Sequence, residues 1–476
     1  EETTTTSTTT TTTTVRRHGS LASMLTSRTD SIMASLLFRE PRMFPKGWGN
    51  LSIPLGLVEE LTSDIDQGNF ESGLTLKEES IIWNDYSLND KMDEEDSIVA
   101  KQGRFLSPIA HVLPDEAKYC SFVFVEPVVS ACRRQQQESE TSKYHNNERC
   151  KNNNNKNRNN NNDSPHPATI VIILPGTGEA DISSRLQIAQ TLAEKHGYAS
   201  VLPDVMFLGD RCPPDQESFF VQNVEHMALQ NVGSMQEAAA LALFFLQGEQ
   251  NNRVCLTGFS FGAAVAVCAA TRCLIAGGGD STLGQRLACA PYVGCSSPAV
   301  LVDGAFRRMV IWDKLQEEMD ENESKNENGA WEQTSNCYGR GSKRRTRRAT
   351  LCEIRSLSDR LRNYLDQFSL PVLVERNLKR EQELGRENRL AAVCVAVMRR
   401  DRIICRKRSQ DLIRDLQKGV VSSSSDAFSL YHLPGGHVSA ALTRFQHHVM
   451  LIEEAAEKLN RQTARHELTI EQGKNS

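Results

Sequence analysis

Short apolar runs alternate with stretches of helical spacing along most of the chain. Residues 169–174 and 199–202 are mainly apolar runs, as in strands buried on both faces, and residues 183–196 repeat apolar side chains at helical spacing. The same pattern predicts strands at residues 121–125, 254–256, 299–302, 391–397 and 431–433, and helices at residues 235–246, 261–273 and 439–459. Apolar strands that alternate with helices predict an α/β fold, with a mostly parallel sheet covered by helices on both faces.

Three polar stretches interrupt this alternation. Residues 3–14 are almost entirely Thr, residues 135–162 end in a run of only Asn, Lys and Arg, and residues 313–348 pass from an acidic to a basic segment. None of them has periodic apolar residues, so each is interpreted as a solvated tail or insertion. The basic cluster at residues 343–348 has two interpretations: a solvated loop, or a signal or patch that recognises an anionic surface.

The composition excludes several classes of protein. A net charge of −5 gives no indication of a nucleic-acid partner. The 13 cysteines are scattered without a C-x-x-C pair, which argues against a disulfide framework or a zinc site and favours a reducing, intracellular compartment. No uncharged apolar run reaches the roughly 18 residues that a membrane-spanning helix needs. Contact with the surface of a membrane is not excluded by this pattern. Residues 15–39 are rich in Arg and Ser with one acid, so they are either a transit segment, which would place the protein in mitochondria, or a polar tail.

The sharpest motif is Gly258-Phe259-Ser260-Phe261-Gly262, between a predicted strand and a predicted helix. A serine on such a turn needs a strained backbone to expose its hydroxyl, and small neighbours allow the strand and the helix to approach each other. The alternative is a tight strand-to-helix turn with an inert serine. The motif predicts that Ser260 is a catalytic nucleophile.

A serine nucleophile needs a base, and the base needs an orienting carboxylate. His437 follows two glycines after the last predicted strand, which suits a loop that presents the imidazole at the edge of the sheet. Two carboxylates lie between Ser260 and His437 at predicted strand ends, Asp401 and Asp303. Asp401 is favoured because it follows the penultimate strand, the usual source of the acid in this architecture, and Asp303 remains the alternative acid.

An oxyanion hole needs backbone N–H groups directed at the charge that develops on the substrate. One donor is predicted to be Phe261, directly after the nucleophile. The other is expected from the glycine-rich segment after residues 169–174, where Thr177 is the first choice and Gly178 the next. No pattern of metal ligands or phosphate-binding glycines is present, so no metal or cofactor is expected.

Together these residues resemble the α/β-hydrolase domain-containing protein 18 family. The resemblance includes Gly47-Trp48-Gly49, Ser107-Pro108-Ile109-Ala110-His111, Gly176-Thr177-Gly178, Gly209-x-Arg211, Gly233 with Glu237, and Gly435-Gly436-His437-Val438-Ser439-Ala440. The chain departs from the family directly after the Gly258–Gly262 motif, where Ala263-Ala264 replaces the usual Gly-His. The family places its acid in a strand-end Glu-Asp, and Arg400-Asp401 occupies that place here. The resemblance implies an α/β-hydrolase fold and an intracellular, mitochondrial setting.

On this basis the chain divides into three parts. Residues 1–45 are predicted to be a low-complexity tail or targeting segment, residues 46–460 an α/β-hydrolase domain with insertions at about 135–166 and 313–350, and residues 461–476 a polar tail. The predicted function is a serine hydrolase that cleaves a carboxylic ester or thioester of a small molecule or a lipid. The alternative is a non-catalytic protein of the same fold that binds or acts as a scaffold.

Overall fold

The fold is that of a large mixed sheet between two layers of helices. The computed structural model describes residues 41–66, 74–86, 98–127, 169–179, 181–216, 220–248, 252–277, 282–328, 350–385, 388–422, 424 and 426–474. The Thr-rich and Arg-containing tail, the Asn-rich run and the basic cluster at 343–348 lie outside these residues. The strands are β1 (Ile82–Asp85), β2 (Ile98–Leu106), β3 (Tyr119–Pro127), β4 (Thr169–Leu174), β5 (Ala199–Pro203), β6 (Arg253–Phe259), β7 (Leu287–Tyr292), β8 (Ala392–Met398) and β9 (Phe428–Leu433).

The strand order is β1-β2-β3-β5-β4-β6-β7-β8-β9. All pairs from β5 to β9 are parallel, whereas β1, β2 and β3 join by antiparallel pairing. Strands β4 to β8 are buried along their whole length, as expected for parallel strands with helices on both faces. The carboxyl ends of these parallel strands therefore share one edge of the sheet.

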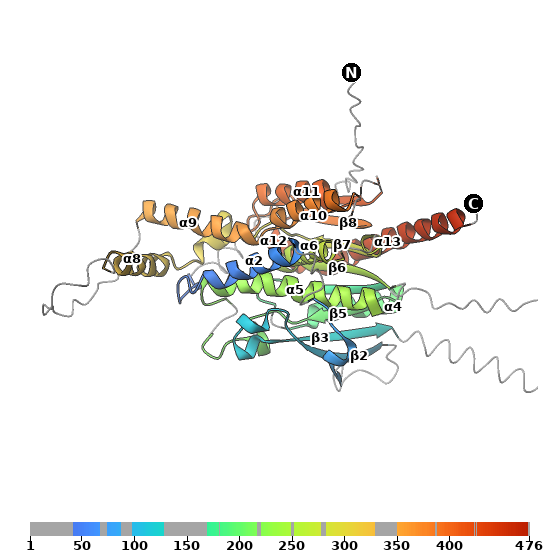
Figure 1. The fold of residues 1–476 in the computed structure, drawn as a ribbon, viewed down its shortest axis with the longest axis horizontal. Helices are drawn as coiled ribbons and strands as arrows, with labels where there is room; N and C mark the ends of the chain where they lie inside the picture. The colour runs from blue at the N-terminus through green and yellow to red at the C-terminus, as the bar shows by residue number, and fades with distance from the viewer. Residues whose placement is uncertain are drawn as a thin grey trace, which may run out of the picture.

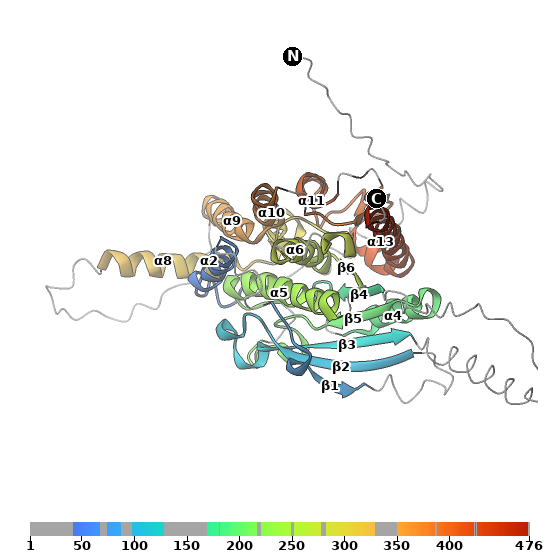
Figure 2. The ribbon, with the colours of Figure 1, turned by 45° about the vertical axis from the view of Figure 1, so that its right-hand side comes forward.

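Helices cover both faces of the parallel strands (Figures 1 and 2). Helices α5 (Val224–Gly248) and α6 (Phe261–Ala276) lie against one face, with α2 (Ser52–Asp66), α10 (Leu370–Leu384) and α11 (Arg406–Gly419) outside them. Helices α4 (Ser183–His196) and α13 (Arg444–Lys474) cover the opposite face. The remaining helices of the described chain are α7 (Val300–Asp303), α8 (Trp312–Asn328), α9 (Leu351–Leu365) and α12 (His437–Leu442).

The prediction of a strand at residues 299–302 is wrong. These residues begin the short helix α7, and the strand that belongs between β6 and β8 is β7. An apolar run of four residues has no periodicity that separates a strand from a helix. The sequence of β7, Leu-Ala-Cys-Ala-Pro-Tyr, has few residues that favour strands, so its neighbours on either side determine its conformation.

Two further predictions also differ from the structure. The helix expected at residues 439–459 is divided at Thr443 into α12 and α13, and α13 continues to Lys474, through most of the expected polar tail. The acidic part of the 313–348 stretch, which was interpreted as part of a solvated insertion, belongs to helix α8. Helix α8 packs on α9 and projects from one end of the molecule (Figure 1).

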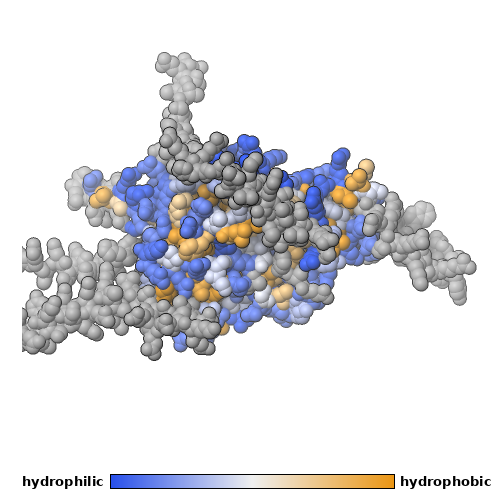
Figure 3. Space-filling model, turned by 180° about the vertical axis from the view of Figure 1, so that it is seen from behind, coloured by the Kyte–Doolittle hydropathy of each residue, from blue (hydrophilic) through white to orange (hydrophobic). Residues whose placement is uncertain are grey.

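The surface of the described residues is mainly hydrophilic when viewed from behind, with hydrophobic residues in smaller groups (Figure 3). The most exposed large apolar side chains are Leu351, at 87%, and Leu442, at 74%. In the part of the chain that the structure describes, no helix combines the length and the apolar character needed to cross a membrane.

Candidate active site

Ser260 occupies a strained turn between β6 and α6. Its backbone has φ 56° and ψ −110°, a combination that L-residues rarely adopt, and helix α6 begins at the next residue. The glycines on either side are required by close approach. A Cβ on Gly258 would lie 2.5 Å from the carbonyl carbon of Gly262, and a Cβ on Gly262 would lie 2.5 Å from the carbonyl oxygen of Leu174. The two glycines therefore allow β4, β6 and α6 to meet at the serine.

A prediction follows for the second of these glycines. Gly262→Ala should destabilise the protein by about 1–3 kcal/mol, because the new methyl group would force the β4 and α6 backbones apart. Thermal unfolding measures this effect. Gly56→Ala in α2 is the matched control, because a Cβ there meets nothing within 4 Å, and alanine favours a helix over glycine. An equal melting temperature for wild type and Gly262→Ala would contradict the tight approach.

His437 lies between Ser260 and Asp401. The distance from its Nε2 to Ser260 Oγ is 2.9 Å, and the distance from its Nδ1 to Asp401 Oδ2 is also 2.9 Å. Ser260 and His437 are 7% and 8% exposed, and the Asp401 side chain is 3% exposed. With an ionised Asp401, Nδ1–H donates to the carboxylate and Nε2 accepts the hydroxyl proton of Ser260. This is the hydrogen-bond chain that activates a serine.

The loops that carry Asp401 and His437 are joined to each other. Strands β8 and β9 pair up to Met398 and Leu433, and beyond them Arg400 N–H donates to the carbonyl of Gly435 at 3.0 Å. The second carboxylate oxygen of Asp401 accepts the N–H groups of the Ile403 and Ile404 backbone, each at 2.8 Å. These bonds fix the orientation of the carboxylate that faces the imidazole.

The His437 loop is shaped by glycine and serine. Gly435 has φ 93°, in the region that favours glycine. The Gly436 N–H donates to Ser439 Oγ at 2.9 Å, at the start of α12. His437 is the first residue of that helix, and its ring lies 5.0 Å from the ring of Phe259.

The structure places the alternative acid, Asp303, elsewhere. Asp303 ends helix α7 rather than a strand, and its carboxylate accepts hydrogen bonds from Arg362 at 2.9 Å and Arg408 at 2.7 Å. Among the described hydrogen bonds, none joins Asp303 to His437. The reason for the difference lies in the strand order, because the carboxylate beside His437 has to follow the strand next to β9, which is β8.

The segment after β4 lies beside the serine. Leu174 pairs with Gly258 in the parallel ladder, so residues 175–179 (the 175–179 loop) continue next to the Ser260 turn. Gly178 has φ 77°, and no hydrogen bond from the N–H groups of Thr177, Gly178 or Phe261 is found within the described residues. These N–H groups are therefore available to a ligand at Ser260.

Glu179 ends this loop and was not anticipated from the sequence. Its carboxylate accepts the Gly176 N–H at 2.8 Å and pairs with both terminal nitrogens of Arg444, at 3.0 and 3.1 Å. Burial acts to raise the pKa of Glu179, but the hydrogen bonds and charge of Arg444 and the charge of Arg185 outweigh it and hold the pKa below its usual value. The only signal in the sequence was the position of a carboxylate directly after Gly176-Thr177-Gly178.

An apolar cavity opens in front of Ser260. Its lining includes Thr177, Gly178 and Phe261, together with apolar side chains from several elements: Met43, Val205, Leu208, Phe220, Met227, Val300, Leu301, Phe306 and Ile404. The catalytic candidates therefore face a site suited to an apolar group.

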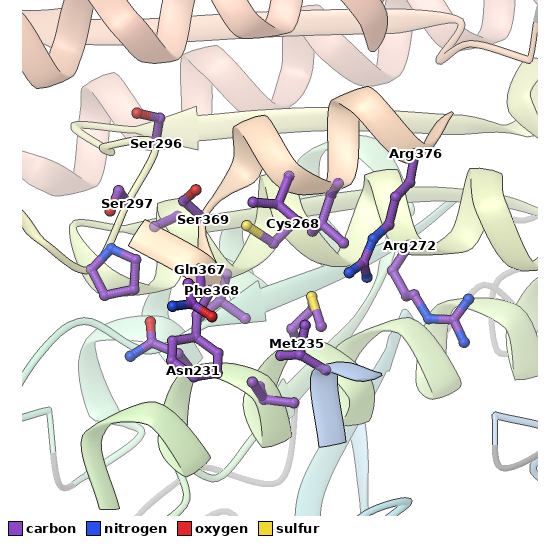
Figure 4. Close-up of a pocket in the computed structure, with 17 residues that line it drawn as sticks. Asn231, Met235, Cys268, Arg272, Ser296, Ser297, Gln367, Phe368, Ser369 and Arg376 are labelled. Carbon is purple, nitrogen blue, oxygen red and sulfur yellow. The ribbon is translucent and has the colours of Figure 1, made fainter. Parts of the chain in front are cut away.

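A second apolar cavity lies between α5, α6 and α10 (Figure 4). The two cavities share Asn231, Ala264 and Pro298 in their walls. Along α6 the second cavity extends from Ala264 past Cys268 to Arg272, a distance of about 12 Å at the rise of an α-helix. The guanidinium of Arg376, from α10, points toward this second cavity (Figure 4).

The comparison with known proteins agrees with this architecture. Residues 155–458 match the family described as alpha/beta hydrolase domain containing 18, over more than half of the chain. The chain belongs to this family. The Ser260 turn, the Asp401 turn and the His437 loop all fall within the matched residues of the alpha/beta hydrolase domain.

In the part of the chain that the structure describes, no group of three or more His, Cys, Asp or Glu side chains could hold a metal ion.

The chain also has a low similarity to several solved structures. Acetyl xylan esterase 1 from Thermoanaerobacterium is 11% identical, with 82% of this chain and 93% of that chain covered and a TM-score of 0.39. A cold-adapted esterase from an Arctic intertidal metagenomic library is 12% identical, with 78% and 100% covered and a TM-score of 0.36. The acylaminoacyl peptidase of Pyrococcus horikoshii is 10% identical, with 75% and 40% covered and a TM-score of 0.37. Among curated proteins, no sequence matches the chain.

Proposed function

We propose that the protein is a serine hydrolase that cleaves a carboxylic ester or thioester through an acyl-enzyme. The observation that carries the proposal is the continuous hydrogen-bond chain from Ser260 through His437 to Asp401. Such a chain has one well-known chemical use, which is to remove the proton of the serine as its oxygen attacks a carbonyl carbon. Membership of an alpha/beta hydrolase family supports the same reaction class.

The reaction would proceed in two halves. In the first half, Ser260 Oγ bonds to the acyl carbon, its proton moves to Nε2 of His437, and that proton then passes to the leaving alcohol or thiol. In the second half, His437 takes a proton from water, the water oxygen bonds to the acyl carbon, and the proton returns to Ser260 as the acid is released. Asp401 stays ionised and stabilises the imidazolium in both halves.

The N–H groups of Phe261 and Thr177, with Gly178 as the second choice in the 175–179 loop, are proposed to bind the oxyanion. Phe261 is the first residue of α6, so the partial positive charge at the start of that helix adds to its N–H. The strained backbone of Ser260 supports this proposal, because a turn of this kind exposes the serine hydroxyl at the start of the helix.

The cavities favour an apolar acyl group. The wall in front of Ser260 is largely apolar, and the second cavity extends along α6 from a shared boundary. Burial of an acyl chain in these cavities would contribute about 0.8 kcal/mol for each CH₂ group. A lipid-like ester is therefore the finer form of the proposal.

A fluorophosphonate probe tests the proposal directly. An activated serine attacks the phosphorus of the probe, and fluoride leaves. We therefore expect one label, on the peptide that contains Ser260. The same protein should hydrolyse p-nitrophenyl butyrate. Folded protein that neither takes up the label nor hydrolyses any ester or thioester would show that the fold serves binding rather than catalysis.

If the substrate is a lipid-like ester, a substitution at Cys268 should affect long-chain esters and not short-chain esters. Cys268 lines the second cavity but not the first. Cys268→Phe should fill that cavity and lower kcat/KM for palmitoyl esters by about tenfold or more, equal to the lost burial of about two CH₂ groups. Turnover of butyryl esters should not change. Cys268→Ala leaves the cavity open and should retain both activities. Equal losses for both chain lengths in Cys268→Phe would exclude the second cavity as part of the acyl site.

A further inference from the structure

A single carboxylate connects the 175–179 loop to the helix that follows His437. Glu179 Oε2 accepts the Gly176 N–H at 2.8 Å, while the Glu179 N–H donates to the carbonyl of Gly176 at 3.2 Å. These two bonds close the loop on itself around Thr177 and Gly178. The side chain of Glu179 is 14% exposed, so its carboxylate is largely shielded from water.

Arg444 holds this carboxylate from the other side. It is the first residue of α13, and its two terminal nitrogens bind the two oxygens of Glu179 at 3.0 and 3.1 Å. A guanidinium that binds both oxygens fixes direction as well as distance, which a single-point contact does not. The partly buried pair is expected to add little net stability, because burial of two charges costs about as much as their attraction returns. The pair at this loop is therefore better explained by the fixed position that it gives the 175–179 loop than by a gain in stability.

Further contacts place the pair beside the reacting groups. The Arg444 guanidinium carbon lies 5.5 Å from the centre of the Phe259 ring, and that ring is 5.0 Å from the His437 ring. On the far side, Arg185 Nε lies 3.5 Å from Glu179 Oε1, and Arg185 also donates to the carbonyl of Pro203 at 2.8 Å. The pair is therefore fixed to α4 and β5 as well as to α13.

We propose that Glu179 and Arg444 are positioning residues, which hold the N–H groups of Thr177 and Gly178 where the oxyanion forms and align them with the His437 segment. This role rests on the proposed function. Neither side chain touches the reacting atoms. Both act through the backbone of the 175–179 loop.

Glu179→Gln tests the role with little change in shape. The amide cannot accept both arginine donors, so the loop should lose its fixed position while Ser260, His437 and Asp401 remain. Loss of one oxyanion donor costs about 10² to 10³ in kcat, and a displaced donor should cost about tenfold to a hundredfold. KM should change little, because the oxyanion exists only in the transition state and the intermediates.

Arg444→Lys is the second variant, and it keeps the charge without the two-point contact. It should lower kcat by a similar or smaller factor. The double variant should be no worse than the more impaired single variant, because both changes break one interaction. Additive losses in the double variant would mean that the residues act separately, which would overturn the proposed pair.

The chain contains a close structural match for a control. Glu381 also accepts a backbone N–H, that of Asn388 at 3.1 Å, and also pairs with an arginine, Arg389, at 3.0 and 3.3 Å. It lies in α10, outside both cavities. Glu381→Gln should therefore leave kcat within about twofold of wild type, a difference of less than 0.5 kcal/mol.

Hydrogen exchange separates this inference from the proposed function. Amide exchange in the peptide that covers residues 175–179 should be faster in Glu179→Gln and Arg444→Lys than in wild type and Glu381→Gln. Faster exchange in a protein without hydrolase activity would retain the pair as the anchor of the loop and reject only the catalysis. Unchanged exchange with wild-type kcat in both variants would overturn the positioning role.

Discussion

Ser260→Ala is expected to lower kcat for ester hydrolysis by on the order of a million-fold, as loss of the nucleophile does in subtilisin. In the proposed mechanism Ser260 Oγ forms the bond to the acyl carbon, and no other hydroxyl among the described residues forms a hydrogen bond with His437 Nε2. The measurement is steady-state hydrolysis of p-nitrophenyl butyrate, with fluorophosphonate labelling of the same samples.

The fold should survive this change, because alanine fits the space of serine. Ser429→Ala is the matched control, since Ser429 is a buried serine at the start of β9 and binds Glu454, away from the carboxyl ends of the strands. It should retain activity and labelling. Ser260→Ala with turnover close to wild type would show that the serine on the turn is not the nucleophile.

Asp401→Asn should lower kcat by on the order of 10⁴ while the protein remains folded. The carboxylate accepts from His437 Nδ1 at 2.9 Å, which fixes the tautomer whose Nε2 can take the proton of Ser260. An amide can donate to Nδ1 instead, which stabilises the wrong tautomer, and it carries no charge to stabilise the imidazolium. The measurement is kcat across neutral pH, with circular dichroism to check the fold.

Asp303→Asn provides the comparison, because Asp303 was the second candidate for the acid. Its carboxylate binds Arg362 and Arg408, so the substitution should affect stability and lower kcat by at most about tenfold, or 1.4 kcal/mol. The contrary result is a nearly inactive Asp303→Asn beside an active Asp401→Asn. Activity in both variants would leave Ser260 and His437 to work without an acid.

The local features of the fold could be predicted from the sequence. The residues around Ser260 specify their turn because glycine alone fits at positions 258 and 262. A Cβ on Gly258 would meet the backbone of Gly262, and a Cβ on Gly262 would meet the backbone of Leu174 in β4. The alternation of apolar strands with helices likewise gave the α/β class, because β4, β5, β6 and β8 are mainly apolar and are buried along their whole length. The positions of Thr177 and His437 followed from the rule that parallel strands end at one edge.

The sequence by itself determined the class of the fold, the Ser260 turn and the loops that would face it. The tertiary structure alone decided which apolar run is a strand, because β7 is held by pairing with β6 and β8 rather than by its own residues. It also decided that Asp401 and not Asp303 meets His437, since strand order depends on contacts between distant segments. The pair of Glu179 with Arg444 joins residues 265 positions apart. Local patterns carry no record of such a contact, because it forms only when α13 packs against the sheet beside β4.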